Sequence, residues 1–232
     1  KENKYDDDIF FQKYSQMSRS QQGLAGAGEW ETLRKLLPDF KDKRVLDLGC
    51  GYGWHCIYAM EHGASSVVGV DISHKMLEVA KEKTHFPQVE YKCCAIEDVE
   101  FPEESFDVIL SSLAFHYVAD YEILVKKIYR ILKSGGKLVF TVEHPVFTAY
   151  GTQDWYYNEK GEILHFPVDN YYYEGKRTAV FLGEKVTKFH RTLTTYLNTL
   201  LSNGFIINHI VEPQPPEYMM DIPGMQDEMR RP

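Results

Sequence analysis

Three alternating glycines in this chain can bring the backbone close to a ligand. Gly49, Gly51 and Gly53 lie where an apolar strand pattern changes into a helical pattern. Glycine allows a sharp turn and leaves no Cβ in a ligand's way, and the positive end of the following helix favours an anionic or polar group. Eighteen residues after Gly53, Asp71 follows a second apolar run, where its carboxylate can accept both hydroxyls of a ribose. Together these residues predict a site for an adenosine-containing ligand.

Short apolar segments and helical patterns alternate around these residues, as in crossover units of a mostly parallel sheet. Strands are expected at 45–48, 66–70, 89–94, 108–111 and 138–142. Helices are expected at 54–62, at 121–132, and from an N-cap at Ser73 to Lys83, with 133–136 turning the chain into the fifth strand. The sequence therefore predicts an α/β fold: a Rossmann-like, doubly wound, mostly parallel sheet.

We expect one domain over 1–232, with four parts. They are a helical cap at 1–40, a binding core at 41–147, a lid insertion at 148–186, and a C-terminal part at 187–232. In the cap, helices are expected at 8–17 and 29–37. In the last part we expect a helix at 187–201, a strand at 205–211 and a loosely held tail, with no convincing strand after that.

The lid is expected from a dense run of aromatic residues, nine between Tyr150 and Phe181. It contains a hairpin pattern in which 155–157 pairs with 163–166 around Asn158 to Gly161. We expect more than half of these rings to form the lid's own core or an oligomer contact, and the others to face a ligand. The oligomeric state is left open.

Composition excludes several classes of protein. The 232 residues are 44% hydrophobic and 26% charged, with a net charge of -8, which disfavours nucleic acid as a partner. No apolar run approaches membrane-span length and no leader opens the chain, so we expect no membrane partner and a cytoplasmic location. The four cysteines show no paired spacing, so we expect reduced thiols and no metal site.

Further motifs occur in a fixed order along the chain. They are 45–53 (VLDLGCGYG), 69–73 (GVDIS) with Met76, 101–108 (FPEESFDV), 111–117 (SSLAFHY) and 131–138 (ILKSGGKL). The spacing GxGxxG of dinucleotide enzymes fits poorly, because its third position falls on Trp54 or Cys56. The ordered set, over roughly 14–148, closely resembles class I S-adenosylmethionine-dependent methyltransferases, most of all the small-molecule branch with the ubiquinone and biotin pathway enzymes.

This resemblance implies S-adenosylmethionine as cofactor, S-adenosylhomocysteine as product, and a set of cofactor-binding positions. That set is Tyr14, Arg19, Asp47, Gly49, Cys50, Gly51, Asp71, Ile72, Met76, Ile96, Glu97, Ser112, Leu113 and His116. The glycine turn would hold the methionine part, Asp71 the ribose, and Ile72, Met76, Ile96 and Glu97 the adenine. Tyr14 and Arg19 would close over the cofactor, with Arg19 pairing with its carboxylate. The chain departs from many relatives at Ala95, where they carry an aspartate for the adenine amine.

Two histidines are the predicted catalytic residues. His116 follows the fourth strand, and His144 stands at the tip of the fifth, where open α/β sheets place ligands. His116 has the alternative of a solvent-facing helix start. Methyl transfer is an in-line displacement that depends mainly on positioning, and a general base is needed only if the acceptor loses a proton.

The acceptor is expected to be a small molecule, because two motifs of other acceptor classes are absent. Ser111-Ser112-Leu113-Ala114 stands where amide- or adenine-methylating enzymes carry Asn/Asp-Pro-Pro-Tyr, and there is no Pro-Cys nucleophile. O-, N- and C-methylation stay open. The alternatives are a non-catalytic S-adenosylmethionine-binding protein and, less favoured, a nucleotide-dependent oxidoreductase.

Overall fold

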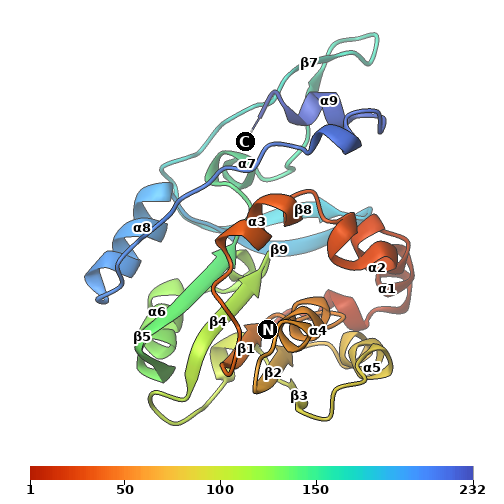
Figure 1. Cartoon of the computed structure of the whole chain (residues 1–232). Coiled ribbons are helices and arrows are strands. Elements are labelled where there is room, and N and C mark those ends of the chain that lie inside the picture. The colour runs from red at the N-terminus through yellow and green to blue at the C-terminus, as the bar shows by residue number, and fades with distance from the viewer. Residues whose placement is uncertain (232) are drawn as a thin grey trace.

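The computed structural model describes residues 1–231, and a five-stranded sheet forms its centre (Figure 1). Its strands are β1 (Arg44–Leu48), β2 (Ser66–Asp71), β3 (Val89–Cys93), β4 (Phe106–Ser112) and β5 (Leu132–Thr141). They follow the order β3-β2-β1-β4-β5, and every neighbouring pair is parallel. The prediction of a doubly wound parallel sheet is confirmed.

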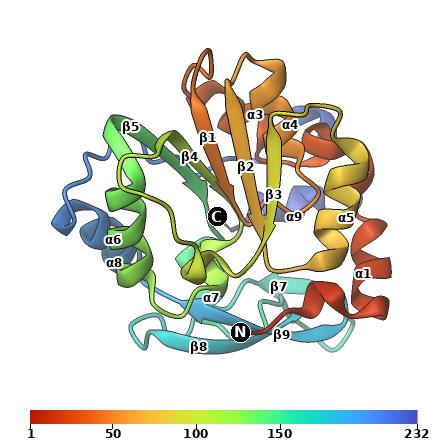
Figure 2. The same cartoon turned by 90° about the horizontal axis from the view of Figure 1, so that it is seen from below.

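Helices cover both faces of the sheet, which explains why the central strands read as nearly continuous apolar runs. Figure 2 shows α3 (Trp30–Leu36), α4 (Trp54–Glu61) and α5 (His74–Lys83) on one face, and α6 (Tyr121–Ile131) and α8 (Leu193–Ser202) on the other. The side chains of Val45, Leu46 and Leu48 are fully buried between these layers. These layers hold the carboxyl ends of β1, β2 and β4 side by side, along the edge of the sheet at which the parallel strands end.

Local capping fixes where the helices begin. The side chain of Ser73 accepts a hydrogen bond from the amide of Met76, and Asp120 does the same for Ile123 at the start of α6. Gly53, with φ of 75°, precedes α4 in the left-handed region. The expected helices at 54–62, 73–83 and 121–132 therefore agree with the structure to within a residue or two at each end.

Two hairpins and the N-terminal segments lie beyond the carboxyl edge of the sheet (Figure 2). The N-terminal elements are η1 (Lys4–Asp6), α1 (Asp8–Ser15), α2 (Ser18–Gln22) and η2 (Gly23–Gly26). The hairpins are β6 (Tyr156–Tyr157) with β7 (Ile163–His165), and β8 (Gly175–Phe181) with β9 (Glu184–His190). Phe10 of α1 is fully buried against Ala179 and Val186 of the second hairpin. The first hairpin was expected and the second was not.

Short elements complete the chain. They are η3 (Ile96–Asp98), η4 (Phe115–Tyr117), α7 (Pro145–Ala149), η5 (Glu217–Met219) and α9 (Met225–Glu228). Among the described residues, no helix has both the length and the apolar character needed to cross a membrane.

The structure corrects two expected boundaries. The helix expected at 187–201 begins only at Leu193, because 187–190 belongs to β9 and Thr192 caps the helix by accepting from the amide of Thr195. The turn expected at 133–136 lies inside β5, where the pairing with β4 shifts register and Gly135 has a φ of 74°. The second hairpin thus crosses the expected limit of the lid at 186.

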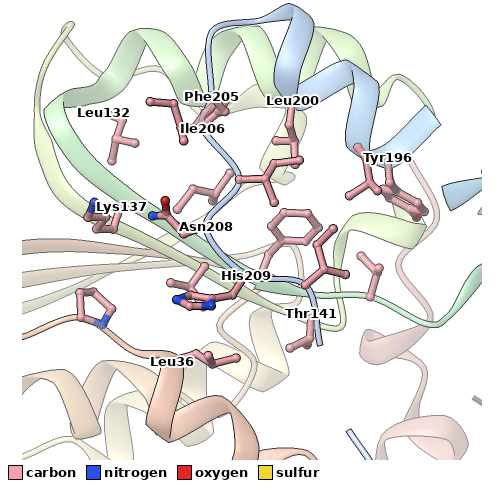
Figure 3. A pocket seen from close by; sticks show the side chains of 18 of the residues that line it. Leu36, Leu132, Lys137, Thr141, Tyr196, Leu200, Phe205, Ile206, Asn208 and His209 are labelled. Carbon is pink, nitrogen blue, oxygen red and sulfur yellow. The ribbon is translucent and has the colours of Figure 1, made fainter. Parts of the chain in front are cut away.

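The strand expected at 205–211 does not form. Phe205 and Ile207 pack on the core, but Ile206 is 85% exposed and the segment runs outside the sheet. A groove of about 1240 Å³ separates it from β5, and Figure 3 shows side chains of both segments, including Thr141 and His209, lining this groove. A strand needs a hydrogen-bonded neighbour, and across the groove this segment has none among residues 1–231.

The tail is better held than its composition suggests. The guanidinium of Arg231 stacks over the rings of Phe147 at 4.4 Å and Phe166 at 4.9 Å, while Arg230 donates to the carbonyl of Leu164 at 2.8 Å. These contacts fasten the end of the described chain to the first hairpin, and the expectation of a loose tail is wrong for Arg230 and Arg231.

Candidate active site

The glycine turn after β1 adopts a backbone that only glycine takes up without strain. Gly49, Gly51 and Gly53 have φ of 78°, 52° and 75°. The amides of Gly49 and Cys50 both donate to the carbonyl of Val70, at 2.8 and 2.9 Å, which fixes the turn against the end of β2. A Cβ on Gly49 would lie 2.5 Å from the Cβ of Ala114, whereas one on Gly51 would meet no protein atom within 4 Å. The backbone at Gly51 is therefore open to a ligand.

Asp71 lies beside this open backbone, at the end of β2. One of its oxygens accepts from the amide of Gly51 at 2.9 Å and the other from the amide of Ser73 at 2.9 Å. Burial raises the pKa of Asp71, although these hydrogen bonds act in the opposite direction. Each carboxylate oxygen keeps a free lone pair, so the group can accept from two neighbouring hydroxyls. The turn and Asp71 meet as predicted, in an arrangement that fits adenosine.

Asp47 and Cys50 lie behind the turn. The Asp47 side chain is 1% exposed, and burial raises its pKa to about 7. It accepts a hydrogen bond from the thiol of Cys56, with Sγ and Oδ2 3.5 Å apart. Cys50 is also buried and packs in the core under α4. At these positions the side chains of Asp47 and Cys50 are better placed to support the turn than to contact a ligand directly.

The residues predicted to border the adenine lie around the ends of β2 and β3. Met76 is 2% exposed on α5. The backbone carbonyl of Ile72 accepts a hydrogen bond from the side-chain amide of Asn3 at 3.2 Å. Ile96 packs against the core, and the carbonyl of Glu97 accepts from Lys127 at 2.8 Å. These four positions follow neighbouring strands of the sheet, as the prediction required.

The end of β4 is tied to β5. Leu113 has a φ of 52°, and its amide donates to the carbonyl and the hydroxyl of Thr141, at 3.0 and 3.1 Å. The hydroxyl of Ser112 lies 3.3 Å from that of Thr141. A non-glycine residue in the left-handed region is uncommon, and such strain gathers at functional sites.

The N-terminal segment reaches this edge of the sheet through tyrosines. The ring of Tyr14 packs edge-on against Tyr5 and Tyr52, with centroids 5.3 and 5.9 Å apart. Burial is the main cause that raises the pKa of Tyr5 and of Tyr14, and the charge of Asp71 adds to it in both. These tyrosines therefore stand close to the carboxylate of Asp71.

Arg19 is engaged within the protein. Its guanidinium forms an ion pair with Glu29, and both side chains are mostly buried. The structure thus gives Arg19 a partner of its own, and contact with a cofactor carboxylate would require this pair to rearrange.

The two predicted catalytic histidines have different surroundings. His116 is 2% exposed, and burial lowers its pKa to about 4. Its Nδ1 accepts from the backbone amide of Glu143 at 3.4 Å, so the neutral ring carries its proton on Nε2. The Nδ1 of His144 accepts from the amide of Val146, and its Nε2 lies 2.8 Å from a carboxylate oxygen of Glu212, beside the groove.

Three side chains that the sequence did not single out form a buried polar ring near His116. The ammonium of Lys188 lies 2.5 Å from Oε1 of Glu143 and donates to Gln153 at 2.9 Å, and the amide of Gln153 donates to Oε2 of Glu143 at 2.8 Å. Lys188 is 3% exposed. The ring joins the segment after β5, the lid and β9.

Comparisons with known proteins agree with this geometry. A model of the family described as "Methyltransferase domain" matches residues 46–140. The structure of a candidate S-adenosylmethionine-dependent methyltransferase from Listeria monocytogenes is 58% identical, with a TM-score of 0.87, over 90% of this chain and 95% of that chain. An S-adenosylmethionine-dependent methyltransferase from Mesorhizobium loti is 40% identical, with a TM-score of 0.83, over 90% of this chain and 96% of that chain. The chain belongs to the S-adenosylmethionine-dependent methyltransferases.

A more distant relative matches about half of the methyltransferase. The ubiquinone biosynthesis O-methyltransferase of Coxiella burnetii is 36% identical over 112 residues, which is 47% of each protein.

The cofactor of this methyltransferase is S-adenosylmethionine, and two of the predicted residues fit it. The open backbone at Gly51 and the two free lone pairs of Asp71 suit the methionine part and the ribose. Within residues 1–231, no group of three or more His, Cys, Asp or Glu side chains is arranged to hold a metal ion.

Sequence reasoning missed one more contribution to this edge. Asp6 accepts from the hydroxyl of Ser73 at 2.6 Å and from the amide of Lys75 at 3.1 Å, so that η1 is fixed against the start of α5. The run Asp6-Asp7-Asp8 resembles an ordinary solvated charge run, and nothing in the sequence distinguishes its first member. Glu143 had a usable signal, since it shares the strand-end position for which His144 was chosen.

Proposed function

We propose that this methyltransferase transfers a methyl group from S-adenosylmethionine to a small-molecule acceptor by in-line displacement. One observation carries the proposal: the second hairpin and η4 cover the region beside the cofactor residues, where His116 and Lys188 are almost fully buried. A protein or nucleic-acid acceptor would have to displace this cover. The net charge of -8 further disfavours nucleic acid.

The named relative supports the same class of acceptor. The Coxiella protein is named for a step in the synthesis of ubiquinone, which is a small molecule. A cytoplasmic location would suit such an activity and stays a prediction.

Five of the predicted residues contact the cofactor in this proposal. Gly49 and Gly51 present the backbone to the methionine part, Asp71 holds the ribose hydroxyls, and Ile72 and Met76 border the adenine. The bound cofactor supplies an electrophilic methyl group on a sulfonium. The protein contributes mainly by holding the acceptor in line with that group and by excluding water.

Calorimetric titration with S-adenosylhomocysteine, and separately with NADH, tests the cofactor site. We expect micromolar binding of S-adenosylhomocysteine and none of NADH. Asp71→Ala should weaken binding at least about 30-fold, because each charge-assisted hydrogen bond contributes about 1.5 to 3 kcal/mol. Asp221→Ala, an exposed carboxylate in the C-terminal segment, is the matched control.

Three results would count against the proposal. Equal binding to the protein and to Asp71→Ala would remove Asp71 from the site. Binding of NADH alone would favour an oxidoreductase. Tight binding of S-adenosylhomocysteine without methylation of any compound in a broad small-molecule panel would favour a non-catalytic binding protein.

A further inference from the structure

The ring of Glu143, Gln153 and Lys188 has features of a functional site. All three members are held by hydrogen bonds or an ion pair of 2.5 to 2.9 Å, in a place from which Lys188 is almost fully excluded from water. Gln153 has a φ of 57°, a left-handed backbone that is unfavourable for a residue other than glycine. Gln153 adopts this conformation where its side chain contacts Glu143.

Tyrosines connect this ring to the cofactor residues. The ammonium of Lys188 lies 6.0 Å from the ring centroid of Tyr117, and the Tyr117 hydroxyl is 3.3 Å from that of Tyr5. Tyr5 in turn lies within the electrostatic reach of Asp71. These contacts form a series from the carboxylate of Asp71 to that of Glu143. The polar ring therefore stands at the far end of the site from Asp71, where an acceptor would meet the methyl group.

Neither histidine has a nitrogen free to take a proton from an acceptor. The Nδ1 of His116 is occupied by the amide of Glu143, and the Nδ1 of His144 is occupied by the amide of Val146. Because each Nδ1 accepts a hydrogen bond, the proton of each neutral ring lies on Nε2, and the Nε2 of His144 stands 2.8 Å from a carboxylate oxygen of Glu212. Glu143 accepts one contact on each oxygen and keeps a lone pair on each.

Resting on the proposed function, we propose that Glu143 is the proton acceptor of the methyl transfer and that the acceptor molecule presents a hydroxyl group. A lone pair of the hydroxyl oxygen forms the new bond to the methyl carbon, while the bond from that carbon to sulfur breaks and its electron pair stays on sulfur. The hydroxyl proton moves to Glu143 and then to water. Lys188 and Gln153 are positioning residues that hold the carboxylate.

The basicity of Glu143 selects the hydroxyl over an amine. Burial would raise the pKa of Glu143, but His116, Lys188 and Gln153 together bring it below its ordinary value. Even at its ordinary pKa a carboxylate is too weak a base to take a proton efficiently from an alkylammonium ion, but it readily takes the proton of an oxonium, which is a far stronger acid than a carboxylic acid. The ionisable groups around Glu143 are His116 and Tyr117 from η4, Lys188 from β9 and Tyr196 from α8.

The test compares the protein with Glu143→Gln, using Glu184→Gln as control. Glu184 is a half-exposed carboxylate at the start of the same strand as Lys188, so its replacement makes the same change in charge. Each protein is titrated with S-adenosylhomocysteine, the resulting complex is titrated with catechol, and methylation is measured with a panel of phenols, catechols, alcohols and amines.

We expect methylation of one or more hydroxyl compounds. Glu143→Gln should lower kcat at least about 100-fold, as loss of a general base does, and weaken the binding of catechol about tenfold. Its affinity for S-adenosylhomocysteine should stay within about twofold, which shows a folded cofactor site. Glu184→Gln should match the unchanged protein in every measurement.

Two results overturn the inference and leave the proposed function intact. One is a kcat of Glu143→Gln that stays within tenfold of that of the unchanged protein. The other is methylation of amines without methylation of any hydroxyl compound. Failure of the unchanged protein to bind S-adenosylhomocysteine would instead overturn the proposed function itself.

Discussion

The two halves of the site are built in different ways. In the cofactor half, Gly51 and Asp71 stand 20 positions apart and are joined by a 2.9 Å hydrogen bond between the ends of adjacent strands. In the acceptor half, Glu143 and Lys188 stand 45 positions apart and belong to the sheet edge and to a hairpin laid over it. A short motif can specify the first half, whereas the second depends on how the insertion folds back.

The largest effect is expected in the acceptor half. Lys188→Met leaves the Glu143 carboxylate buried without its partner, so the free energy of unfolding should fall by about 3 to 5 kcal/mol. The double variant with Glu143→Gln should regain most of this loss, because no unpaired charge stays buried. Urea unfolding of the two single variants and the double variant measures the coupling. Equal losses in Lys188→Met and in the double variant would contradict a specific ion pair.

A second effect should appear in the dependence of stability on pH. Burial lowers the pKa of His116 to about 4, below the value of about 6.5 in an unfolded chain. Between these values the unfolded chain binds a proton that the folded chain does not, so stability falls as the pH drops from about 6.5 to about 4. Over this range the free energy of unfolding should fall by up to about 3 kcal/mol.

The contribution of His116 can be compared with that of His55, which lies in the cofactor half. Burial also lowers its pKa to about 4, but His55 as a whole is only half-buried whereas His116 is almost fully buried, so its share should be smaller. Urea unfolding of His116→Asn and His55→Asn from pH 7.5 to 4.5 separates the two shares. The same slope in His116→Asn as in the unchanged protein would contradict the buried neutral state.

A smaller effect should separate two glycines of the cofactor half. Gly49→Ala should lower the free energy of unfolding by about 3 kcal/mol, because it adds a steric clash with Ala114 to an unfavourable φ. Gly51→Ala should cost only about 1 kcal/mol, because its Cβ meets no protein atom within 4 Å. Both should lose affinity for S-adenosylhomocysteine, measured by calorimetry. If Gly51→Ala kept full affinity, the cofactor would not lie against this backbone.

The sequence predicted those parts of the molecule that depend on contiguous residues. The five strands, the cap of α5 and the pairing of the glycine turn with Asp71 follow from local patterns and from the rules of parallel sheets. The stretch 187–190 was misjudged, because Phe189 is its only apolar residue and one such residue cannot distinguish helical spacing from strand alternation. Only the partner strand β8 decides between the two.

The acceptor half could not be predicted in the same way. Nothing near Lys188 in the sequence distinguishes it from a surface lysine, and its burial depends on Glu143 and Gln153, which lie 45 and 35 positions away. The aromatic lid shows the same limit. Tyr172 and Tyr173 are 88% and 75% exposed, while Trp155 packs on Phe166, so the position of each ring was not evident from its type.

The edge of the sheet at β5 affects how molecules of this protein meet one another. Its outer side has no paired strand among residues 1–231, and such an edge offers amides and carbonyls to a strand of a neighbouring molecule. Lys133 and Lys137 place charges along this strand, and the irregular pairing around Gly135 twists its first part. Both features oppose edge-to-edge stacking, so that self-association through this edge is discouraged by charge and by shape.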